Sequence, residues 1–364
     1  MEYRKFILCF VITTMTFVSI YSYFIFKKDP IGYYNLQENS EYYYYNARYQ
    51  IPAFIKNLEY DTVIIGPSMS QNFDEDKINL IFEVESYNAS LSAASAKEQN
   101  YIYNLSSSSH PKLKQVFWEL NFDSLYGSVD RVNEDSGEFP TYLYNKNKMD
   151  DLKYLFSYYA GEALHDKIEA EKGEALKQTP YGIYKFGKGV PHLIPEQYRN
   201  EKAVSNENPV PEGVGFKDMK ANFDENIYPI LKGNPNQNFK LYYTPYSILY
   251  HIFNYNRSKQ AFIDRLLLKE YIFERVKELK NVQIYDFQTE RKITFNLNHY
   301  VDNSHYFAYI NDWMIKELNQ DTYLQTEKTT KLSNKVLLEQ VEKFSGSQLG
   351  NDTEEDFKES ILAK

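Results

Sequence analysis

The serine at position 68 has the residue type and the sequence position of an enzymatic nucleophile. A short β-branched run, Val63 to Ile65, stops at Gly66-Pro67, and Ser68 follows directly. A brief apolar run that ends at turn residues is typical of a buried parallel strand. Ligands bind at the carboxyl ends of such strands, where backbone N–H groups at the start of the next helix can stabilise an oxyanion. The same residues are also typical of a plain turn followed by a helix cap.

A serine hydroxyl needs a general base, usually a histidine that a carboxylate orients. Asp302 and His305 are three residues apart in the loop after the last predicted strand. On a turn the two side chains share one face, so Asp302 can accept from one ring nitrogen while the other faces the serine. The loop after the last strand of a doubly wound sheet lies near the end of the first strand. We therefore predict a catalytic triad of Ser68, His305 and Asp302.

The same loop has two other interpretations. His299, Asp302 and His305 form an H-x-x-D-x-x-H pattern, and these residue types bind zinc or iron. The loop can also be a polar connection whose histidine is satisfied by hydrogen bonds. A metal site leaves Ser68 unexplained, so we expect neither a metal nor a cofactor.

Strands and helices alternate along much of the chain, which predicts βαβ units and a parallel sheet. We expect an α/β fold, a flavodoxin-like three-layer α/β/α arrangement around a central parallel five-stranded sheet. The predicted strands are residues 63–65, 84–88, 116–120, 239–243 and 282–287. Helices are expected at residues 53–58, 73–82, 258–279 and 310–318.

A long insertion, residues 123–237, interrupts this alternation after the third strand and holds most of the glycine and proline of the chain. A structureless loop of that length is improbable in a compact domain, so we expect helices at 148–159 and 163–175. The insertion is either a substrate-binding cap above the functional edge of the sheet or a structural or partner-binding surface.

The N-terminal segment, residues 6–26, has 21 residues without a charge. At ~1.5 Å per residue such a helix just spans a bilayer core of roughly 30 Å. No A-x-A-like cleavage site follows, so we expect a retained signal-anchor rather than a removed signal peptide. Residues 1–5 would then be a cytoplasmic stub, and the rest of a single-pass protein would be extracytoplasmic at the cell membrane.

Beyond the anchor we expect a membrane-proximal lead-in at 27–58, the main domain at 59–317, and a polar C-terminal tail at 318–364. The tail can form one helix around 336–344, and residues 345–364 are expected to be disordered. The tyrosines at 42–45 either pack on the domain or serve as interfacial anchors or a sugar-stacking surface. The net charge of −9 argues against a nucleic-acid partner, and the single cysteine, Cys9, excludes an intrachain disulfide.

Several segments resemble the SGNH (GDSL-like) hydrolase superfamily: Gly66-Pro-Ser68, Asn121 after the third strand, and Asp302-x-x-His305. The resemblance covers residues 59–317 apart from the insertion. More closely, the chain is similar to membrane-anchored SGNH-like proteins of Gram-positive bacteria, with teichoic-acid D-alanyl transfer and cell-wall O-acetyltransferase or esterase proteins as distant kin. The segments that carry this similarity are Arg48-Tyr-Gln-x-Pro52, Gly66-x-Ser-Met-x-x-Asn-Phe73, Thr244-Pro-Tyr-Ser-Ile-Leu-Tyr250, Val282-x-Ile-Tyr-Asp-Phe287 and His305-Tyr-x-x-x-Ile-Asn-Asp-Trp313.

The resemblance implies that Ser68 is the nucleophile, His305 the base and Asp302 its orienting carboxylate. It implies an oxyanion hole built from the residues Ser68, Met69, Ala93 or Ala94, and Asn121, the first ones through backbone N–H groups and Asn121 through its side chain. Three departures concern this hole. Pro67 stands where an aspartate is usual, Ala93-Ala94 where a glycine is usual, and the third block, Glu119-Leu-Asn-Phe-Asp123, keeps only its asparagine. A backbone donor survives at the alanines if φ stays negative there.

The implied function is that of an extracytoplasmic serine esterase or acyltransferase. Its substrates would be acyl esters of a cell-wall polysaccharide or teichoic acid, with a membrane-bound acyltransferase as a further partner. The alternative is a non-catalytic SGNH-like envelope protein that binds glycan or the acyltransferase partner.

Overall fold

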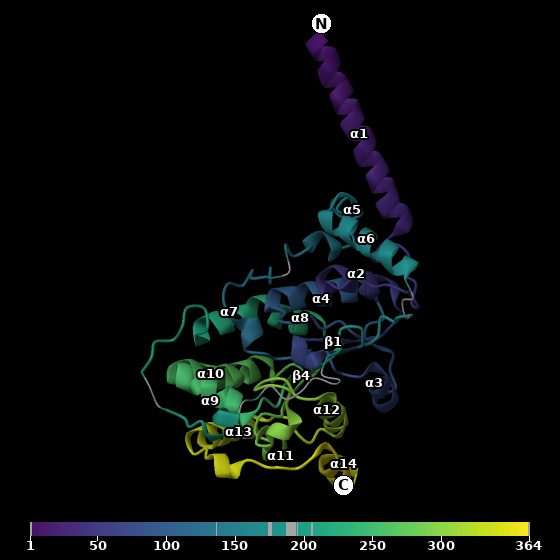
Figure 1. Cartoon of the computed structure of the whole chain (residues 1–364). Helices are drawn as coiled ribbons and strands as arrows, with labels where there is room; N and C mark the ends of the chain where they lie inside the picture. Colours follow the sequence, from purple (N-terminus) through teal and green to yellow (C-terminus); the bar gives the residue numbers. More distant parts are fainter. Residues whose placement is uncertain are drawn as a thin grey trace. The chain divides into compact units, whose positions relative to one another are not determined.

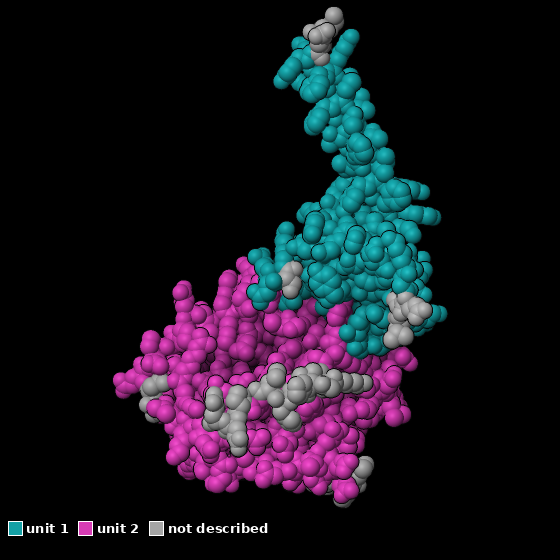
Figure 2. Space-filling model, viewed as in Figure 1, with its two compact units in different colours: residues 1–59, 104–111, 134–183 teal, residues 60–103, 112–133, 184–364 magenta. Residues whose placement is uncertain are grey.

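The structure is a computed structural model that describes residues 2–135, 137–173, 177–186, 194, 196–204 and 207–362 (Figure 1). The chain divides into two compact units (Figure 2). Unit 1 comprises residues 1–59, 104–111 and 134–183, and unit 2 comprises residues 60–103, 112–133 and 184–364. Each unit is therefore assembled from segments that are far apart in the sequence.

Unit 2 contains a five-stranded sheet in which every neighbouring pair is parallel, in the order β2-β1-β3-β4-β5. The strands are β1 (Thr62–Ile65), β2 (Ser86–Asn88), β3 (Gln115–Glu119), β4 (Asn238–Tyr243) and β5 (Val282–Asp286). The order changes direction between β1 and β3, and in open α/β sheets ligands bind at such a switch point. The structure confirms the predicted α/β fold with a central parallel sheet.

Helices cover both faces of this sheet. On one face, Ile64, Phe117 and Tyr242 pack into a core with α3 (Glu75–Phe82) and α12 (Ala308–Gln320). On the other face, Trp118 stacks on Tyr103 of α4 (Ala96–Ser109), and Asp286 forms a buried ion pair with Lys269 of α10 (Lys259–Val276). Helix α10 also contacts α7 (Phe216–Asn226), α8 (Tyr228–Gly233), α9 (Ile248–Arg257) and α13 (Glu327–Glu342).

Short polar side chains define where several of these helices begin. Asp74 accepts from the backbone N–H groups of Asp76 and Lys77 at the start of α3. Ser247 caps α9, and Ser258 caps α10. Helix α10 corresponds to the helix predicted at 258–279, and α9 is a separate helix directly before it. These caps satisfy N–H groups that have no partner within the helix.

The segment between β3 and β4 does not form one body. Residues 134–183 belong to unit 1, whereas 123–133 and 184–237 belong to unit 2. The helices α5 (Asp151–Leu155) and α6 (Tyr158–Lys172) replace the predicted helices at 148–159 and 163–175. Part of the glycine-rich stretch around 181–191 lies outside the described residues. The predicted insertion, residues 123–237, is thus divided between the two units.

Unit 1 begins with α1 (Glu2–Lys28), a helix long and apolar enough to cross a membrane. The next helix, α2 (Ala47–Asn57), begins six residues before the predicted start at 53 and runs through Pro52. Proline cannot donate to the carbonyl four residues earlier. That carbonyl, on Arg48, instead accepts from the hydroxyl of Tyr144 at 2.9 Å, which explains why the helix continues.

The tyrosines at 42–45 differ in their surroundings. Tyr43 and Tyr44 are buried, so the packing interpretation holds for them, whereas Tyr45 is exposed. Gln50 of α2 is fully buried and accepts from the backbone N–H of Tyr44 at 2.9 Å. The lead-in therefore folds back on α2 and forms part of the core of unit 1.

The C-terminal segment is ordered where disorder was predicted. Leu337 and Val341 of α13 and the following Phe344 join a hydrophobic core of unit 2. A further helix, α14 (Glu354–Leu362), buries Phe357 against His299, with ring centroids 4.8 Å apart. The prediction for 345–362 was wrong because one aromatic side chain in a charged stretch is enough to dock the helix.

The remaining short elements are α11 (Arg291–Thr294), η1 (Ser68–Ser70), η2 (Asp123–Leu125), η3 (Thr141–Leu143), η4 (Glu196–Asn200), η5 (Leu297–His299) and η6 (Gly346–Gln348).

Candidate active site

Ser68 lies at the carboxyl end of β1, at the start of the short helix η1. The turn before it is so tight that a Cβ on Gly66 would lie 2.3 Å from Oγ of Ser70 and 2.9 Å from Cβ of Glu119. Only glycine fits that position. The turn therefore depends on Gly66, and it leaves Ser68 partly exposed at the switch point of the sheet.

The three residues predicted to form a triad come together. Oγ of Ser68 lies 2.8 Å from Nε2 of His305, and Nδ1 of His305 lies 2.8 Å from Oδ2 of Asp302. About a third of the side chain of His305 and of Asp302 is exposed, so solvent can reach both groups. The serine and the carboxylate thus occupy opposite nitrogens of one imidazole, which is the arrangement that general-base activation of a serine requires.

The loop that carries His305 is fixed at several points. Tyr300 and Tyr306 pair as an antiparallel bridge, and both side chains are buried. The hydroxyl of Tyr300 donates to the carbonyl of Pro245 at 2.6 Å, and the hydroxyl of Ser247 donates to the carbonyl of Asn303. The segment after β4 therefore supports the loop that follows β5.

Asp302 is held as a carboxylate. Burial opposes its ionisation, but hydrogen bonds from the ring and the backbone of His305 and from the backbone of Ser304 outweigh that effect and lower the pKa of Asp302 below its usual range. Its Oδ1 accepts from the backbone N–H groups of Ser304 and His305 at 2.8 and 2.7 Å. The carboxylate is consequently charged at neutral pH and oriented toward the imidazole.

Two asparagines, the buried Asn311 and the partly buried Asn88, hold the nucleophile turn, and the sequence analysis did not assign either to the site. Asn311 of α12 donates to the carbonyl of Met69 at 3.0 Å. Asn88, at the end of β2, donates to the carbonyls of Ser70 and Phe73 at 2.8 and 3.2 Å. The sequence positions of both residues could have indicated a role at the site, because Asn88 ends a predicted strand and Asn311 lies in the segment that follows His305. The amides fix the backbone of Ser68 relative to α12 and β2.

Glu119 is a second residue that sequence reasoning left without a role. It ends β3 and is almost completely buried. Its carboxyl group accepts from the hydroxyl of Ser70, from the amide of Asn121 at 3.0 Å and from the hydroxyl of Thr244 at 3.3 Å. Burial raises the pKa of Glu119 to about 7, although these hydrogen bonds and the charge of His305 oppose the rise.

The predicted oxyanion hole is only partly formed. The amide group of Asn121 donates to Glu119 and to the hydroxyl of Tyr246, so both of its hydrogens are engaged. The N–H of Ala94 donates to the carbonyl of Leu91 at 3.1 Å. In this structure both predicted donors are engaged elsewhere, Asn121 with Glu119 and Tyr246 and Ala94 with the carbonyl of Leu91.

Three other backbone donors remain near the turn. Among the described residues, the N–H groups of Ser68, Met69 and Ala93 have no hydrogen-bond acceptor. Ala93 has φ of +51°, in the left-handed region, whereas the sequence analysis required a negative φ for a donor there. Ser68 and Met69 are thus predicted donors that the structure leaves available.

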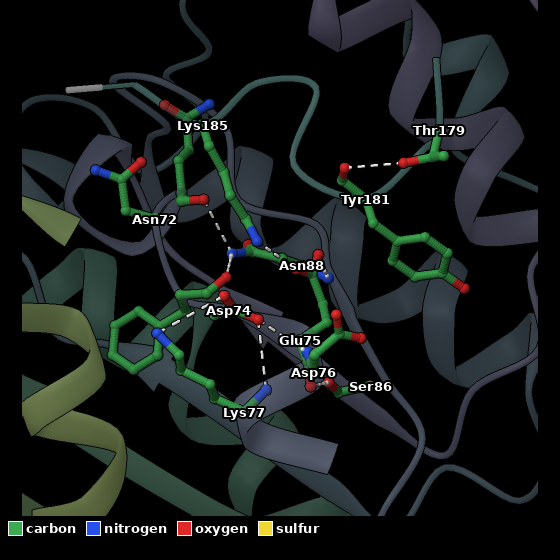
Figure 3. A network of polar contacts seen from close by, with 12 residues as sticks. Asn72, Asp74, Glu75, Asp76, Lys77, Ser86, Asn88, Thr179, Tyr181 and Lys185 are labelled. Carbon is green, nitrogen blue, oxygen red and sulfur yellow. Dashed lines mark hydrogen bonds and ion pairs between the residues drawn. The ribbon is translucent and has the colours of Figure 1, made fainter. Parts of the chain in front are cut away.

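A short segment of unit 2, residues 184–186, lies against the triad. The ring of Phe186 contacts the imidazole of His305 edge-to-face, with centroids 5.2 Å apart. The backbone N–H of Phe186 donates to Oδ1 of Asn72 at 2.8 Å. Nζ of Lys185 lies 2.6 Å from Oε2 of the buried Glu75 (Figure 3). Phe186 thus forms one wall of the site, and the ion pair fixes it there.

The metal interpretation of the loop fails on the position of His299. Its side chain is fully buried, with Nδ1 2.8 Å from the hydroxyl of Tyr309 and Nε2 3.2 Å from the amide of Asn296. Burial lowers the pKa of His299 to about 4. Both ring nitrogens are engaged away from Asp302 and His305, and the described part of the chain contains no cluster of three metal-ligating side chains.

Comparison with protein-family models and with curated proteins finds no match to this chain. A serine, an imidazole and a carboxylate in hydrogen-bonded sequence can generate a nucleophilic alkoxide and accept its proton.

Proposed function

We propose that the protein is a membrane-anchored serine esterase or acyltransferase of the SGNH type that acts outside the cytoplasmic membrane. The observation that carries this proposal is the relay from Ser68 through His305 to Asp302, with both hydrogen-bond distances at 2.8 Å. The three residues come from the end of β1 and from the loop before α12, so the fold itself brings them together. A purely structural histidine would not need a charged partner on one nitrogen and a partly exposed serine on the other.

The reaction follows from the roles of the three groups. Oγ of Ser68 attacks the carbonyl carbon of an ester while Nε2 of His305 takes the hydroxyl proton. The oxyanion of the tetrahedral intermediate faces the backbone N–H groups at the start of η1. The ester C–O bond then breaks, the leaving alcohol takes the proton from His305, and the acyl group stays on Ser68. Water or an acceptor hydroxyl, deprotonated by His305, releases the acyl group by the reverse sequence.

The proposed substrates are acyl esters of a cell-wall polysaccharide or a teichoic acid. Support comes from the resemblance of the triad segments to SGNH-like envelope proteins and from the N-terminal helix, which would keep the site close to the membrane. An acyltransferase needs an acceptor in place of water, and a membrane-bound acyltransferase would supply the acyl group.

The test is covalent labelling of the full-length protein in detergent with a fluorophosphonate probe, followed by mass spectrometry of the labelled peptide. We expect the label on Ser68 and its loss in the variants Ser68→Ala and His305→Ala. The variant Ser347→Ala removes an exposed serine and serves as the matched control that keeps the label. Absence of labelling in folded wild-type protein would refute the proposed activity.

A second candidate function is favoured by the state of the oxyanion hole. The amide of Asn121 is engaged by Glu119 and Tyr246, which leaves no side-chain donor at the predicted place. A protein without that donor can retain a triad and bind glycan or a membrane-bound acyltransferase without catalysis. The same labelling experiment separates the two functions, because a non-catalytic protein gives no covalent adduct.

A further inference from the structure

Unit 1 exposes four large apolar side chains within ten residues of sequence. Met149, Leu152, Phe156 and Tyr158 have 71, 47, 50 and 75% of their surface exposed. The first three are spaced by three and four residues, so they share one side of the helical segment around α5. Lys148 and Lys153, both exposed, flank them. We call the four apolar side chains the α5 apolar surface.

Helices α5 and α6 lie beside the C-terminal end of α1 (Figure 1). The hydroxyl of Tyr21 donates to the carbonyl of Ser157 at 2.8 Å. A Cβ on Gly161 would lie 2.6 Å from the same hydroxyl, so the glycine permits this close approach. Nζ of Lys167 donates to the carbonyl of Lys28 at 3.2 Å, which ties the other end of α6 to the end of α1.

These contacts place α6 at a defined level along α1. The start of α6 lies level with Tyr21, and Lys167 lies level with Lys28. At ~1.5 Å per residue, the start of α6 is about 10 Å closer to the membrane centre than the lysines that end α1. The start of α6 therefore lies level with the apolar end of α1. Tyr154, a buried residue of α5, contacts Tyr33 and Tyr34, which follow α1, with ring centroids 5.4 and 6.1 Å apart.

We propose that the α5 apolar surface inserts into the lipid leaflet that the C-terminal end of α1 crosses. The inference rests on α1 spanning a membrane, as proposed above. A bilayer is the occupant that fits, because the surface is continuous with a lipid-facing helix and is flanked by lysines that can reach lipid phosphates. Tyr158 at its edge is a residue type that favours the membrane interface. Unit 1 would thus be held by a helix and by a second, interfacial contact.

The experiment places a fluorophore at single sites of the full-length chain in lipid nanodiscs. In a Cys9→Ser background, the variants Leu152→Cys and Phe156→Cys each receive an environment-sensitive NBD label. Quenching by lipids that carry a nitroxide near the headgroup is then measured. The positive control is Phe17→Cys in α1, and the matched negative control is Leu80→Cys, an exposed leucine on α3 of unit 2. We expect several-fold stronger quenching at 152 and 156 than at 80.

Quenching at 152 and 156 equal to that at 80, with strong quenching at 17, would overturn the inference and leave the anchor intact. Absence of quenching at all four sites would overturn the anchor as well. Burial of the 152 and 156 labels without lipid quenching would mean that a protein covers the surface, which also contradicts the proposal. Photoactivatable lipids applied to wild-type protein give an independent readout, since crosslinks at 149–158 are expected without any substitution.

Discussion

Glu119 gives a quantitative prediction, because it is a buried carboxyl group whose proton is linked to folding. Its pKa of about 7 in the folded protein compares with an ordinary value of 4.5. At ~1.4 kcal/mol per pH unit, that gap corresponds to about 3 kcal/mol. Burial is the main cause of the raised pKa of Glu119. Replacement of Glu119 by an uncharged side chain of the same shape should therefore remove this pH-dependent contribution to stability.

The sign follows from proton binding. Between pH 4.5 and about 7 the folded protein keeps a proton on Glu119 that the unfolded chain has lost. Raising the pH through this window therefore favours unfolding. The stability that protonated Glu119 contributes is fully present below pH 4.5 and is lost as the pH rises through 7. The variant Glu119→Gln cannot ionise and should lack this loss.

The assay is urea unfolding of wild type and Glu119→Gln in detergent at several pH values from 5 to 8. Both tryptophans, Trp118 and Trp313, are buried in unit 2, so their fluorescence reports the unfolding of the unit that contains Glu119. We expect the free energy of unfolding of wild type, relative to the variant, to fall by about 3 kcal/mol across this range. The control Glu355→Gln removes an exposed carboxylate and should show no such trend. Parallel curves for wild type and Glu119→Gln would refute the assignment of a raised pKa.

Three further predictions concern the triad and its walls. Asp302→Asn should lower the rate of p-nitrophenyl acetate hydrolysis on the order of 10³- to 10⁴-fold, because the amide no longer fixes the imidazole tautomer of His305; an unchanged rate contradicts the triad. Phe186→Ala should raise kcat/KM for a hexanoyl ester relative to an acetyl ester, since it opens one wall of the site; an unchanged ratio of the two constants means that the ring does not limit acyl length. Gly66→Ala should destabilise the fold by about 1–3 kcal/mol, measured by urea unfolding, because the added methyl group meets Oγ of Ser70 at 2.3 Å; a neutral effect would show that the turn relaxes.

Much of the fold could be predicted from local sequence. All five strands were located to within two residues at each end, because β-branched and aromatic runs bounded by turn residues mark buried parallel strands. The helix ends were less accurate. The start of α2 was missed because Pro52 favours a boundary. The carbonyl that the proline leaves without its helical partner accepts from Tyr144, which is distant in the sequence.

The triad was predictable, whereas its surroundings were not. Residue type and spacing suffice to propose Ser68, His305 and Asp302. Nothing in the local sequence indicates that the amide of Asn121 donates a hydrogen bond to Glu119. This bond forms because the end of β3 is buried beside the nucleophile turn. The contact of Phe186 with His305 joins residues more than a hundred positions apart, and no periodicity reports it.

The division of the chain into two units has a consequence for the order of assembly. Unit 1 needs residues 104–111 and 134–183 in addition to the N-terminal 59 residues. Its first helix therefore leaves the ribosome long before the α5 and α6 helices that pack on it. During synthesis, the buried tyrosines near α2 remain without the 134–183 segment of unit 1 until three of the five strands have been made. Any fragment that begins at residue 60 would leave residues 134–183 without the N-terminal segment of unit 1, so truncation cannot separate unit 2 cleanly from unit 1.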